Sequence, residues 1–283
     1  MTITREDVRA YYDQNTRLFL AFNRSGTADN IHRSLWNDEV KTLEQALNAT
    51  NQKILQEIQV TAPTHAKIAD LGCGVGASLL YIVPRLKNPA SVFGLTLSSV
   101  QARLARQFAK RSNLEKQVLF TEGDFTSVSL ADNSLDVIYS VEAIVHAQEP
   151  EKYFQEASRL LRPGGKLILV DDYQAARSLS KDEAEWLRAF INGWHVPGVI
   201  TIEQTKAFAE KYHLQPIKDD NLTPYLRLRN LPGPIANLFL FLGNRLPIWH
   251  AILPSMLGSL ALQQCLHRKI VEYWFLVFEK NNR

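Results

Sequence analysis

The sequence predicts an α/β protein built on a doubly wound, mostly parallel seven-stranded sheet. Short apolar segments alternate with amphipathic helical patterns along residues 61–175, and this order places parallel strands between two layers of helices. A glycine-rich turn, Asp70-Leu71-Gly72-Cys73-Gly74-Val75-Gly76, joins the first strand to a helix. Because ligands of such sheets bind beyond the carboxyl ends of the strands, this turn marks the expected site.

The predicted strands alternate with helices over most of the chain. We expect strands over 67–71, 91–96, 117–121, 135–140, 166–170, 214–218 and 272–278, the sixth of them at an edge of the sheet. Helices are expected over 4–22, 40–58, 77–86, 98–112, 151–161, 180–191 and 202–212. Thr4 and Ser98 are the expected N-caps of the first and fourth helices.

We predict one structural domain in three parts. Residues 1–60 form a helical N-terminal lid and the first core helix, 61–175 form the ligand-binding core, and 176–283 complete it around an inserted apolar helical cap at about 224–265. Prolines interrupt the apolar segment 231–262, and its unbroken stretches are shorter than the roughly 20 residues that a membrane-spanning helix needs. This segment suits a substrate cap or a contact in a homo-oligomer equally well.

Composition narrows the possible partners and the compartment. The formal net charge is +3, and no run of lysine and arginine is present, so nucleic acid is not an expected partner. The two cysteines are too few for a disulfide framework and fit a reducing compartment. Because the first residues also lack the apolar region of a signal peptide, we predict a cytoplasmic location, with no transmembrane segment.

Taken alone, the glycine turn leaves two classes of ligand open. Gly72, Gly74 and Ala77 satisfy the dinucleotide pattern G-x-G-x-x-G/A, so a nicotinamide-dependent oxidoreductase is one interpretation. The second strand, however, ends in Thr96 rather than in the carboxylate that a dinucleotide ribose expects. Asp70 before the first glycine favours a small charged ligand whose amino acid portion lies against the turn.

Several motifs together resemble the class I S-adenosylmethionine-dependent methyltransferases, over roughly residues 4–175. The turn at 70–76 resembles the family signature D-x-G-x-G-x-G, and Leu160-Leu161-Arg162-Pro163-Gly164-Gly165 resembles its turn after a helix. Two further segments, 94–101 (GLTLSSVQ) and 140–147 (SVEAIVHA), are similar to the branch that contains sterol, tocopherol and cyclopropane-fatty-acid enzymes. The resemblance implies the Rossmann-like methyltransferase fold and S-adenosyl-L-methionine as the cofactor.

The resemblance also implies which residues hold this cofactor. The methionine portion would lie against the turn, and the residues concerned are Asp70, Gly72, Gly74 and Gly76. The ribose would meet Thr96 and Leu97 near Gln101, and the adenine would meet Asp124 and Phe125. Ser140 and Val141 would lie under the sulfonium, whereas Tyr12 and His32 of the lid would close over the carboxylate and methyl side.

Glu142 and His146 are the acid/base candidates. They are four residues apart, and we expect them on one face of a helix that begins after the fourth strand. If an alkene carbon accepts the methyl group, Glu142 can stabilise the resulting cation and, with His146, remove a proton. We assign no metal site, although Asp171 and Asp172 are placed to hold a metal if the acceptor carries a diphosphate.

The sequence therefore predicts methyl transfer to a hydrophobic small molecule such as a terpenoid, an indole alkaloid or a lipid-like natural product. The sterol-like segment and the apolar cap motivate this prediction. A cyclopropane-forming or methylation-triggered cyclising enzyme is the alternative within the same fold, and the nicotinamide-dependent oxidoreductase is the remote one. The sequence does not define the acceptor, or whether carbon, nitrogen or oxygen is methylated.

Overall fold

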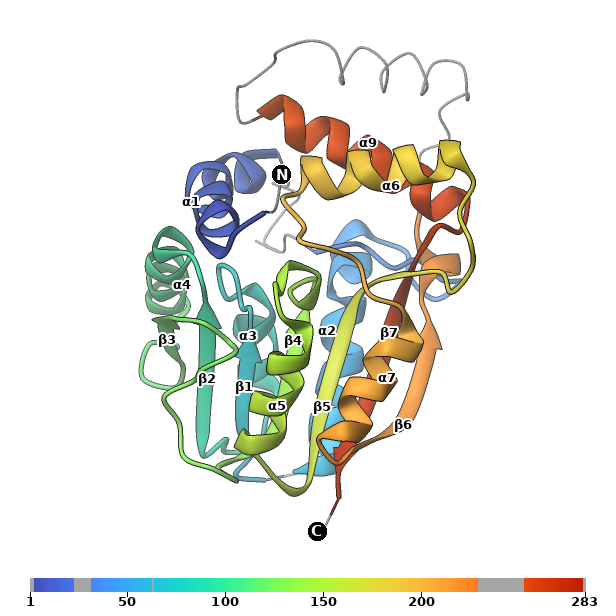
Figure 1. Ribbon diagram of the computed structural model, residues 1–283. Coiled ribbons are helices and arrows are strands. Elements are labelled where there is room, and N and C mark those ends of the chain that lie inside the picture. Colours follow the sequence, from blue (N-terminus) through green and yellow to red (C-terminus); the bar gives the residue numbers. More distant parts are fainter. Residues whose placement is uncertain (1–2, 23–31, 63, 229–251, 282–283) are drawn as a thin grey trace.

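The computed structural model describes residues 3–22, 32–62, 64–228 and 252–281, and its centre is one twisted sheet (Figure 1). The strand order is β3-β2-β1-β4-β5-β7-β6, which confirms the doubly wound seven-stranded prediction. The strands are β1 (Lys67–Leu71), β2 (Ser91–Thr96), β3 (Leu119–Glu122), β4 (Leu135–Val141), β5 (Leu161–Gln174), β6 (Leu214–Asn221) and β7 (Val271–Lys280). Of the strands that the structure describes, only β7 runs antiparallel to its two neighbours, and β6 lies at the edge as predicted.

Helices cover both faces of this sheet (Figure 1). One face packs against α2 (Leu43–Thr61), α3 (Ala77–Ile82) and α4 (Ser99–Arg111), and the other packs against α5 (Pro150–Leu160) and α7 (Ile202–Lys211). Successive strand residues point to opposite faces, so Ile68 joins one buried cluster and Ala69 the other. The strands are apolar on both sides because both sides are covered.

Side-chain caps fix where several helices begin. Ser98 accepts a hydrogen bond from the backbone N–H of Gln101, which confirms it as the N-cap of α4. Thr4 and Asp7 satisfy each other's backbone N–H groups at the start of α1 (Arg5–Phe22). Reciprocal Thr/Ser-to-Gln/Glu capping boxes also open α2, α7 and α6 (Lys181–Gly193).

Two elements differ from the sequence prediction near the site. The helix expected over 77–86 ends at Ile82 and continues as a 3-10 turn, η1 (Val83–Arg85), because Pro84 has no N–H to donate. The strand expected over 166–170 extends at both ends. Leu161 pairs with Leu135 of β4 at its start, and β7 pairs with it as far as Gln174 at its end. The longer strand carries Asp171 and Asp172 beyond the edge of the parallel sheet.

The prediction of a helix that holds both Glu142 and His146 is wrong. The N–H of Glu142 donates to the carbonyl of Val170 at 2.7 Å, and Glu142 has a φ of 51°, which takes it out of a helical conformation. Only one 3-10 turn follows, η2 (Ile144–His146). The four-residue spacing therefore does not bring these two side chains onto one helix face, and tertiary contacts place each of them instead.

A layer of helices covers the carboxyl ends of the parallel strands (Figure 1). It consists of α1, α6 and α9 (Ile252–His267), and the hydroxyl of Tyr11 on α1 donates to Ser255 of α9 at 3.0 Å. Close packing joins α6 to α9, since a Cβ on Gly258 would lie 2.8 Å from the backbone carbon of Gly193.

Most of the apolar cap predicted at 224–265, including all of 231–251, lies outside the described residues. No helix in the described ranges combines the length and apolarity that a membrane span requires.

Candidate active site

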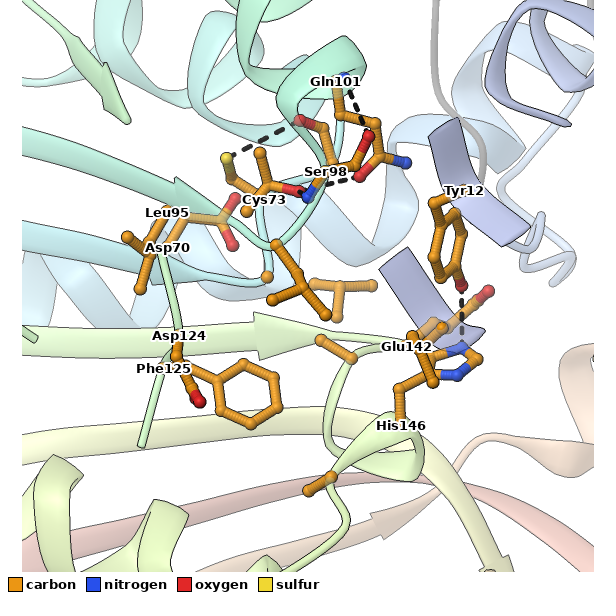
Figure 2. A pocket seen from close by; sticks show the side chains of 18 of the residues that line it. Tyr12, Asp70, Cys73, Leu95, Ser98, Gln101, Asp124, Phe125, Glu142 and His146 are labelled. Atoms are coloured by element: carbon orange, nitrogen blue, oxygen red, sulfur yellow. Dashed lines mark hydrogen bonds between the residues drawn. The ribbon is translucent and has the colours of Figure 1, made fainter. Parts of the chain in front are cut away.

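A cavity of about 320 Å³ lies where the sheet prediction places the ligand, between the carboxyl ends of the strands and α1 (Figure 2). Nearly all of the predicted site residues line it. They are Tyr12, His32, Asp70, Gly72, Gly74, Thr96, Leu97, Gln101, Asp124, Phe125, Val141, Glu142 and His146. Side chains more than 130 residues apart in sequence thus share one chamber.

Two predicted cofactor residues, Gly76 and Ser140, do not line this cavity. A Cβ on Gly76 would lie 2.5 Å from the ring of Phe120, so this glycine permits α3 to pack closely on the sheet. The hydroxyl of Ser140 donates to the carbonyl of Leu71 at 2.6 Å and lies 2.6 Å from the hydroxyl of Tyr153. Both residues support the elements that line the cavity, and their direct contacts with the cofactor stay a prediction.

The first two glycines of the turn have different roles. Gly72 has a φ of 101°, and a Cβ there would lie 2.3 Å from the Cβ of Ala143. The close approach of the segment after β4 therefore requires glycine at position 72. Gly74 has a φ of 54°, but a Cβ there would meet only the side-chain nitrogen of Gln101, at 3.9 Å. The space above Gly74 is therefore an open cradle that a ligand backbone can enter.

Asp70 is a buried carboxyl beside this cradle. Burial raises the pKa of Asp70 to about 8, an effect that the neighbouring Tyr139 hydroxyl only partly offsets. Within the described ranges, no basic side chain forms an ion pair with Asp70. A ligand with an ammonium group near the turn would supply the missing positive charge, as the amino acid portion of S-adenosylmethionine does, and this chemistry fits that cofactor.

The next part of the cavity is polar and suits a nucleoside. The hydroxyl of Thr96 donates to Gln101 at 2.7 Å, so the end of β2 presents a hydrogen-bonded pair in place of a carboxylate. Asp124 accepts hydrogen bonds from the backbone N–H and the hydroxyl of Thr126, and from the guanidinium of Arg5 on α1 at 2.5 Å. Although Asp124 is partly buried, these hydrogen bonds hold its pKa below the usual range. Phe125 packs edge-on against the ring of Tyr153, leaving its own ring along the cavity wall.

The other end of the cavity holds three groups suited to proton transfer (Figure 2). The hydroxyl of Tyr12 lies 2.7 Å from Nε2 of His146. Burial lowers the pKa of His146 to about 4, so its imidazole is neutral and one ring nitrogen can accept a proton. Glu142 lies beside this pair, and its Oε1 accepts from the backbone N–H of Arg33 and from the hydroxyl of Tyr273, each at 2.9 Å. Burial also lowers the pKa of His32, which lines the same end.

Sequence reasoning missed the ion pair behind Glu142. The guanidinium of Arg33 donates to both carboxylate oxygens of Asp172, at 2.7 and 2.6 Å, and lies 4.6 Å from the ring centre of Tyr273. Arg33 follows His32 directly, so its position in the lid was a signal that could have been used. Trp194, which follows α6 and lines the cavity, carried no such signal.

The metal site considered for Asp171 and Asp172 is not supported by their hydrogen bonds. Asp172 is occupied by Arg33, and Asp171 accepts from the backbone N–H groups of Val145 and Asp172 at 3.1 and 2.8 Å. Burial and the neighbouring Asp172 charge raise the pKa of Asp171 to about 8, which disfavours the charged form that a metal ligand needs. Across the described ranges, no group of three or more histidine, cysteine, aspartate or glutamate side chains is arranged to hold a metal ion.

Known proteins share both the motifs and the fold. A family model described as a methyltransferase domain matches residues 69–169. The methyltransferase GfsG of Streptomyces halstedii is 31% identical over 167 residues, which cover 58% of this chain and 57% of that protein. The 27-O-demethylrifamycin SV methyltransferase of Amycolatopsis mediterranei is 27% identical, covering 70% of this chain and 71% of that protein. A sterol 24-C-methyltransferase of Aspergillus fumigatus is 39% identical over 99 residues, covering 35% of this chain and 26% of that enzyme.

Solved structures extend the likeness in fold to almost the whole chain. The cyclopropane synthase MmaA2 of Mycobacterium tuberculosis has a TM-score of 0.77 at 20% identity, covering 99% of each chain. A putative sarcosine dimethylglycine methyltransferase of Galdieria sulphuraria has a TM-score of 0.75 at 18% identity, covering 96% of this chain and 99% of that one. The residues that match the methyltransferase domain, 69–169, contain the signature turn, Thr96 and Asp124. The chain is therefore similar to S-adenosylmethionine-dependent methyltransferases in its motifs over residues 69–169 and in its fold.

Proposed function

We propose that this protein transfers the methyl group of S-adenosylmethionine to a hydrophobic small molecule in natural-product biosynthesis. The observation that carries the proposal is the set of groups that share one cavity. The open cradle at Gly74, the buried Asp70, the Thr96–Gln101 pair and Asp124 line it, and so do Tyr12, Glu142 and His146. The first set suits a donor with a charged amino acid portion and a nucleoside, and the second suits an acceptor held beside acid/base groups.

When bound, S-adenosylmethionine supplies an electrophilic methyl group, so alignment and exclusion of water provide most of the acceleration. Helix α1 contributes to both, because Arg5, Val8 and Tyr12 close the cavity above the glycine turn. Asp13 fixes α1 against α4 by accepting from the hydroxyl of Ser98 and from the backbone N–H of Val100. Helix α1 thus packs on Ser98 and Val100, which follow Thr96, the residue proposed to face the ribose.

Glu142 and His146 are the proposed acid/base residues. Neutral His146 accepts a proton directly or through the hydroxyl of Tyr12, with which it is hydrogen-bonded. The carboxylate of Glu142 stabilises positive charge that develops on an acceptor carbon or nitrogen. We propose these roles from the shared chamber and from the contacts of the two side chains, rather than from the helical spacing in the sequence.

The class of acceptor rests on the relatives and on the walls of the cavity. The similar proteins act, by their names, on sterols, tocopherols and a rifamycin, and structural neighbours include geranyl diphosphate methyltransferases. Apolar side chains at the acid/base end, among them Val141, Ala143 and Trp194, suit a hydrophobic acceptor. We also propose a cytoplasmic location, which fits the free, buried thiols of Cys73 and Cys265.

A second function within the same fold is a cyclopropane-forming or cyclising reaction triggered by methyl addition. The fold of MmaA2 and of the [4+2]-cyclase SpnF keeps this alternative open, at TM-scores of 0.77 and 0.74. The same carboxylate that stabilises a methylated cation can hold that cation while it closes a ring. NMR of the isolated product separates the two, because a methyl group and a ring methylene give different spectra.

The test combines binding of the donor product with transfer to a defined panel. Calorimetry with S-adenosylhomocysteine is expected to show one site per chain. Methyl-labelled S-adenosylmethionine is then offered with a sterol, a tocopherol, 27-O-demethylrifamycin SV and geranyl diphosphate, and mass spectrometry follows the label into the organic extract. Glu142→Gln is expected to keep the calorimetric signal and to lower turnover by about 10² or more. Absence of binding to the protein would overturn the proposal.

A further inference from the structure

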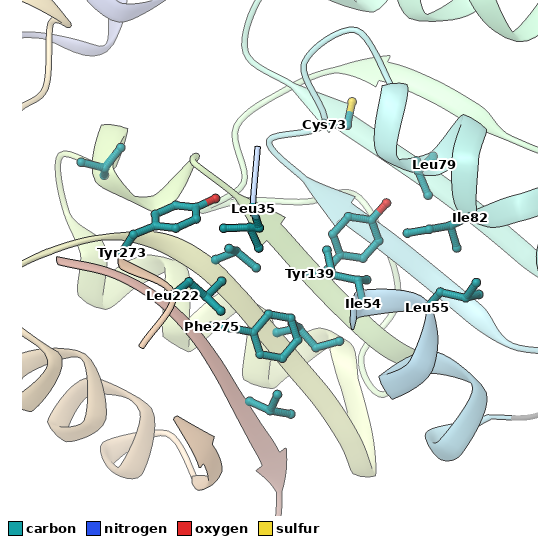
Figure 3. Close-up of a cluster of buried hydrophobic side chains, with 14 of the residues drawn as sticks. Leu35, Ile54, Leu55, Cys73, Leu79, Ile82, Tyr139, Leu222, Tyr273 and Phe275 are labelled. Carbon is teal, nitrogen blue, oxygen red and sulfur yellow. The ribbon is translucent and has the colours of Figure 1, made fainter. Parts of the chain in front are cut away.

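Tyr273 reaches the acid/base residues from outside the cavity. It lies on β7, its side chain is fully buried, and it belongs to the same apolar cluster as Leu35 and Leu222 (Figure 3). Its hydroxyl is nevertheless polar and donates to Oε1 of Glu142 at 2.9 Å. A buried hydroxyl directed from the core at a cavity carboxylate acts on the site without touching a ligand.

The sheet register explains how this contact arises. Antiparallel pairing of β5 with β7 sets Asp172 opposite Tyr273. Between them lies the guanidinium of Arg33, which is bidentate on Asp172 and stacked over the Tyr273 ring. The backbone N–H of Arg33 then donates to Oε1 of Glu142, so two donors converge on the same oxygen.

This arrangement leaves the two oxygens of Glu142 unequal. Oε1 carries two hydrogen bonds from groups that are themselves buried and held, one by the strand and one by the ion pair. Within the described part of the chain, no hydrogen bond ends on Oε2. Since Glu142 lines the cavity, its second oxygen is the one available to an acceptor.

We propose that Tyr273 and Arg33 are positioning residues that fix the carboxylate of Glu142 in one orientation beside Tyr12 and His146. The inference rests on the proposed role of Glu142 in methyl transfer. A carboxylate held by two donors keeps its geometry when the acceptor arrives, whereas a free one would have to be ordered at that moment. Tyr273 therefore affects the rate of turnover and leaves cofactor binding alone.

Tyr273→Phe removes only the hydroxyl and retains the buried ring. We expect turnover (kcat) to fall about tenfold, the value of one hydrogen bond to a charged group, with the KM for S-adenosylmethionine and the Kd for S-adenosylhomocysteine within about twofold. The matched control is Tyr173→Phe on the neighbouring strand β5. Tyr173 is equally buried, and its hydroxyl has no hydrogen-bond partner in the described ranges, so turnover should not change.

A double-mutant cycle tests whether Tyr273 acts through Glu142. If it does, adding Tyr273→Phe to Glu142→Gln costs no further turnover. A tenfold loss that persists in the Glu142→Gln background would overturn the positioning role, as would full turnover of Tyr273→Phe. If Glu142→Gln itself turns over normally, the proposed function of Glu142 fails, and that outcome is distinct from a failure of the positioning inference.

A spectroscopic measurement tests the same inference without any acceptor. Carbon-13 NMR of protein labelled at glutamate carboxyls, in complex with S-adenosylhomocysteine, gives a Glu142 resonance that is assigned by its loss in Glu142→Gln. We expect one sharp resonance in the parent protein and in Tyr173→Phe. Tyr273→Phe is expected to shift or broaden it as the carboxylate samples more orientations. An unchanged resonance in Tyr273→Phe would contradict the inference.

Discussion

The hydroxyl of Tyr12 lies 2.7 Å from Nε2 of His146, so one hydrogen bond joins the roof of the cavity to the segment that follows β4. Tyr12 is on α1, whereas His146 ends the 3-10 turn η2. The ring of the neighbouring Tyr11 lies edge-on to that of Tyr12, with the centroids 5.4 Å apart, and its hydroxyl donates to Ser255 on α9. Adjacent tyrosines of one helix thus connect it to the active site and to α9.

Tyr12→Phe and Tyr11→Phe form a matched pair that separates these two connections. Tyr12→Phe is expected to lower turnover at least tenfold with little change in stability, because His146 loses the hydroxyl partner that faces the cavity. Tyr11→Phe is expected to lower the free energy of unfolding by about 1 kcal/mol with unchanged turnover. Denaturant unfolding and product formation, measured on the same preparations, check both. Equal effects of the two variants on turnover would contradict the assignment.

His146 should contribute a loss of stability as the pH falls. Its pKa is lowered to about 4 by burial, whereas an unfolded histidine takes up a proton near pH 6.5. Between pH 6.5 and 4 the unfolded state therefore binds more protons, and the native state loses about 3 kcal/mol of stability from this group. His146→Gln is expected to remove that loss.

The pH experiment is read as a difference between the two proteins. Asp70 and Asp171 have pKa values raised to about 8, so their contributions have the opposite sign and stability from them increases as pH falls from 8 to 4. Both carboxyls are present in the parent and in His146→Gln, and they cancel in the comparison. Parallel stability curves from pH 6.5 to 4 would show that His146 does not titrate as stated.

The glycines of the turn should respond differently to alanine. Gly72→Ala places a Cβ 2.3 Å from Ala143 and is expected to destabilise the fold by about 3 kcal/mol. Gly74→Ala carries only the strain of its positive φ, about 1 kcal/mol, but its methyl group enters the cradle. We expect affinity for S-adenosylhomocysteine to fall at least tenfold in Gly74→Ala.

Gly164→Ala is the control for backbone strain. Gly164 has a φ of 74°, and a Cβ there would meet nothing within 4 Å. It does not line the cavity, so its alanine variant should share the stability cost of Gly74→Ala and bind S-adenosylhomocysteine normally. Calorimetry on the three variants decides the matter, and normal binding by Gly74→Ala would refute the cradle.

The Arg33–Asp172 pair should be costly to break on one side. Asp172→Leu leaves a buried guanidinium without its carboxylate and is expected to lower the free energy of unfolding by about 3–5 kcal/mol. The double variant Arg33→Met/Asp172→Leu is expected to recover most of that loss, since no unpaired charge remains. Lys206→Met breaks the more exposed pair with Asp219 and should cost less than about 1 kcal/mol. Additive losses in the double variant, measured by urea unfolding, would count against a coupled pair.

Local patterns in the sequence were sufficient to predict which residues meet at the carboxyl ends of the parallel strands. The turn over 70–76, Thr96 and Asp124 lie at or just after the ends of β1, β2 and β3, which are neighbours in the sheet, and the alternation of strands with helices predicts that these strands are parallel. The prediction failed at Glu142 and His146 because the four-residue rule assumes a helix, and the bond from Glu142 to Val170 excludes one. The spacing was a coincidence, although both side chains do reach the cavity.

The contacts behind Glu142 could not be predicted from one sequence. Arg33 and Asp172 are 139 residues apart, and Tyr273 meets Asp172 only through the register of an antiparallel pair. The register of a strand pair depends on which faces of the two strands are buried. Because β5 and β7 are buried on both faces over much of their length, their apolar residues do not select one alignment. A functional tyrosine in such a strand looks like any other core aromatic.

The position of β7 between β5 and β6 also sets an order of events during synthesis. Strand β6 emerges first, yet among the described strands its one neighbour is β7, which begins at Val271. Until the ribosome has released those later residues, β6 has no strand to pair with and β5 exposes an open edge. Tyr273 lies on that same strand. The hydroxyl that donates to Glu142 therefore comes into place in the step that completes the sheet. A partly synthesised chain can already have the glycine turn, but not the ordered carboxylate.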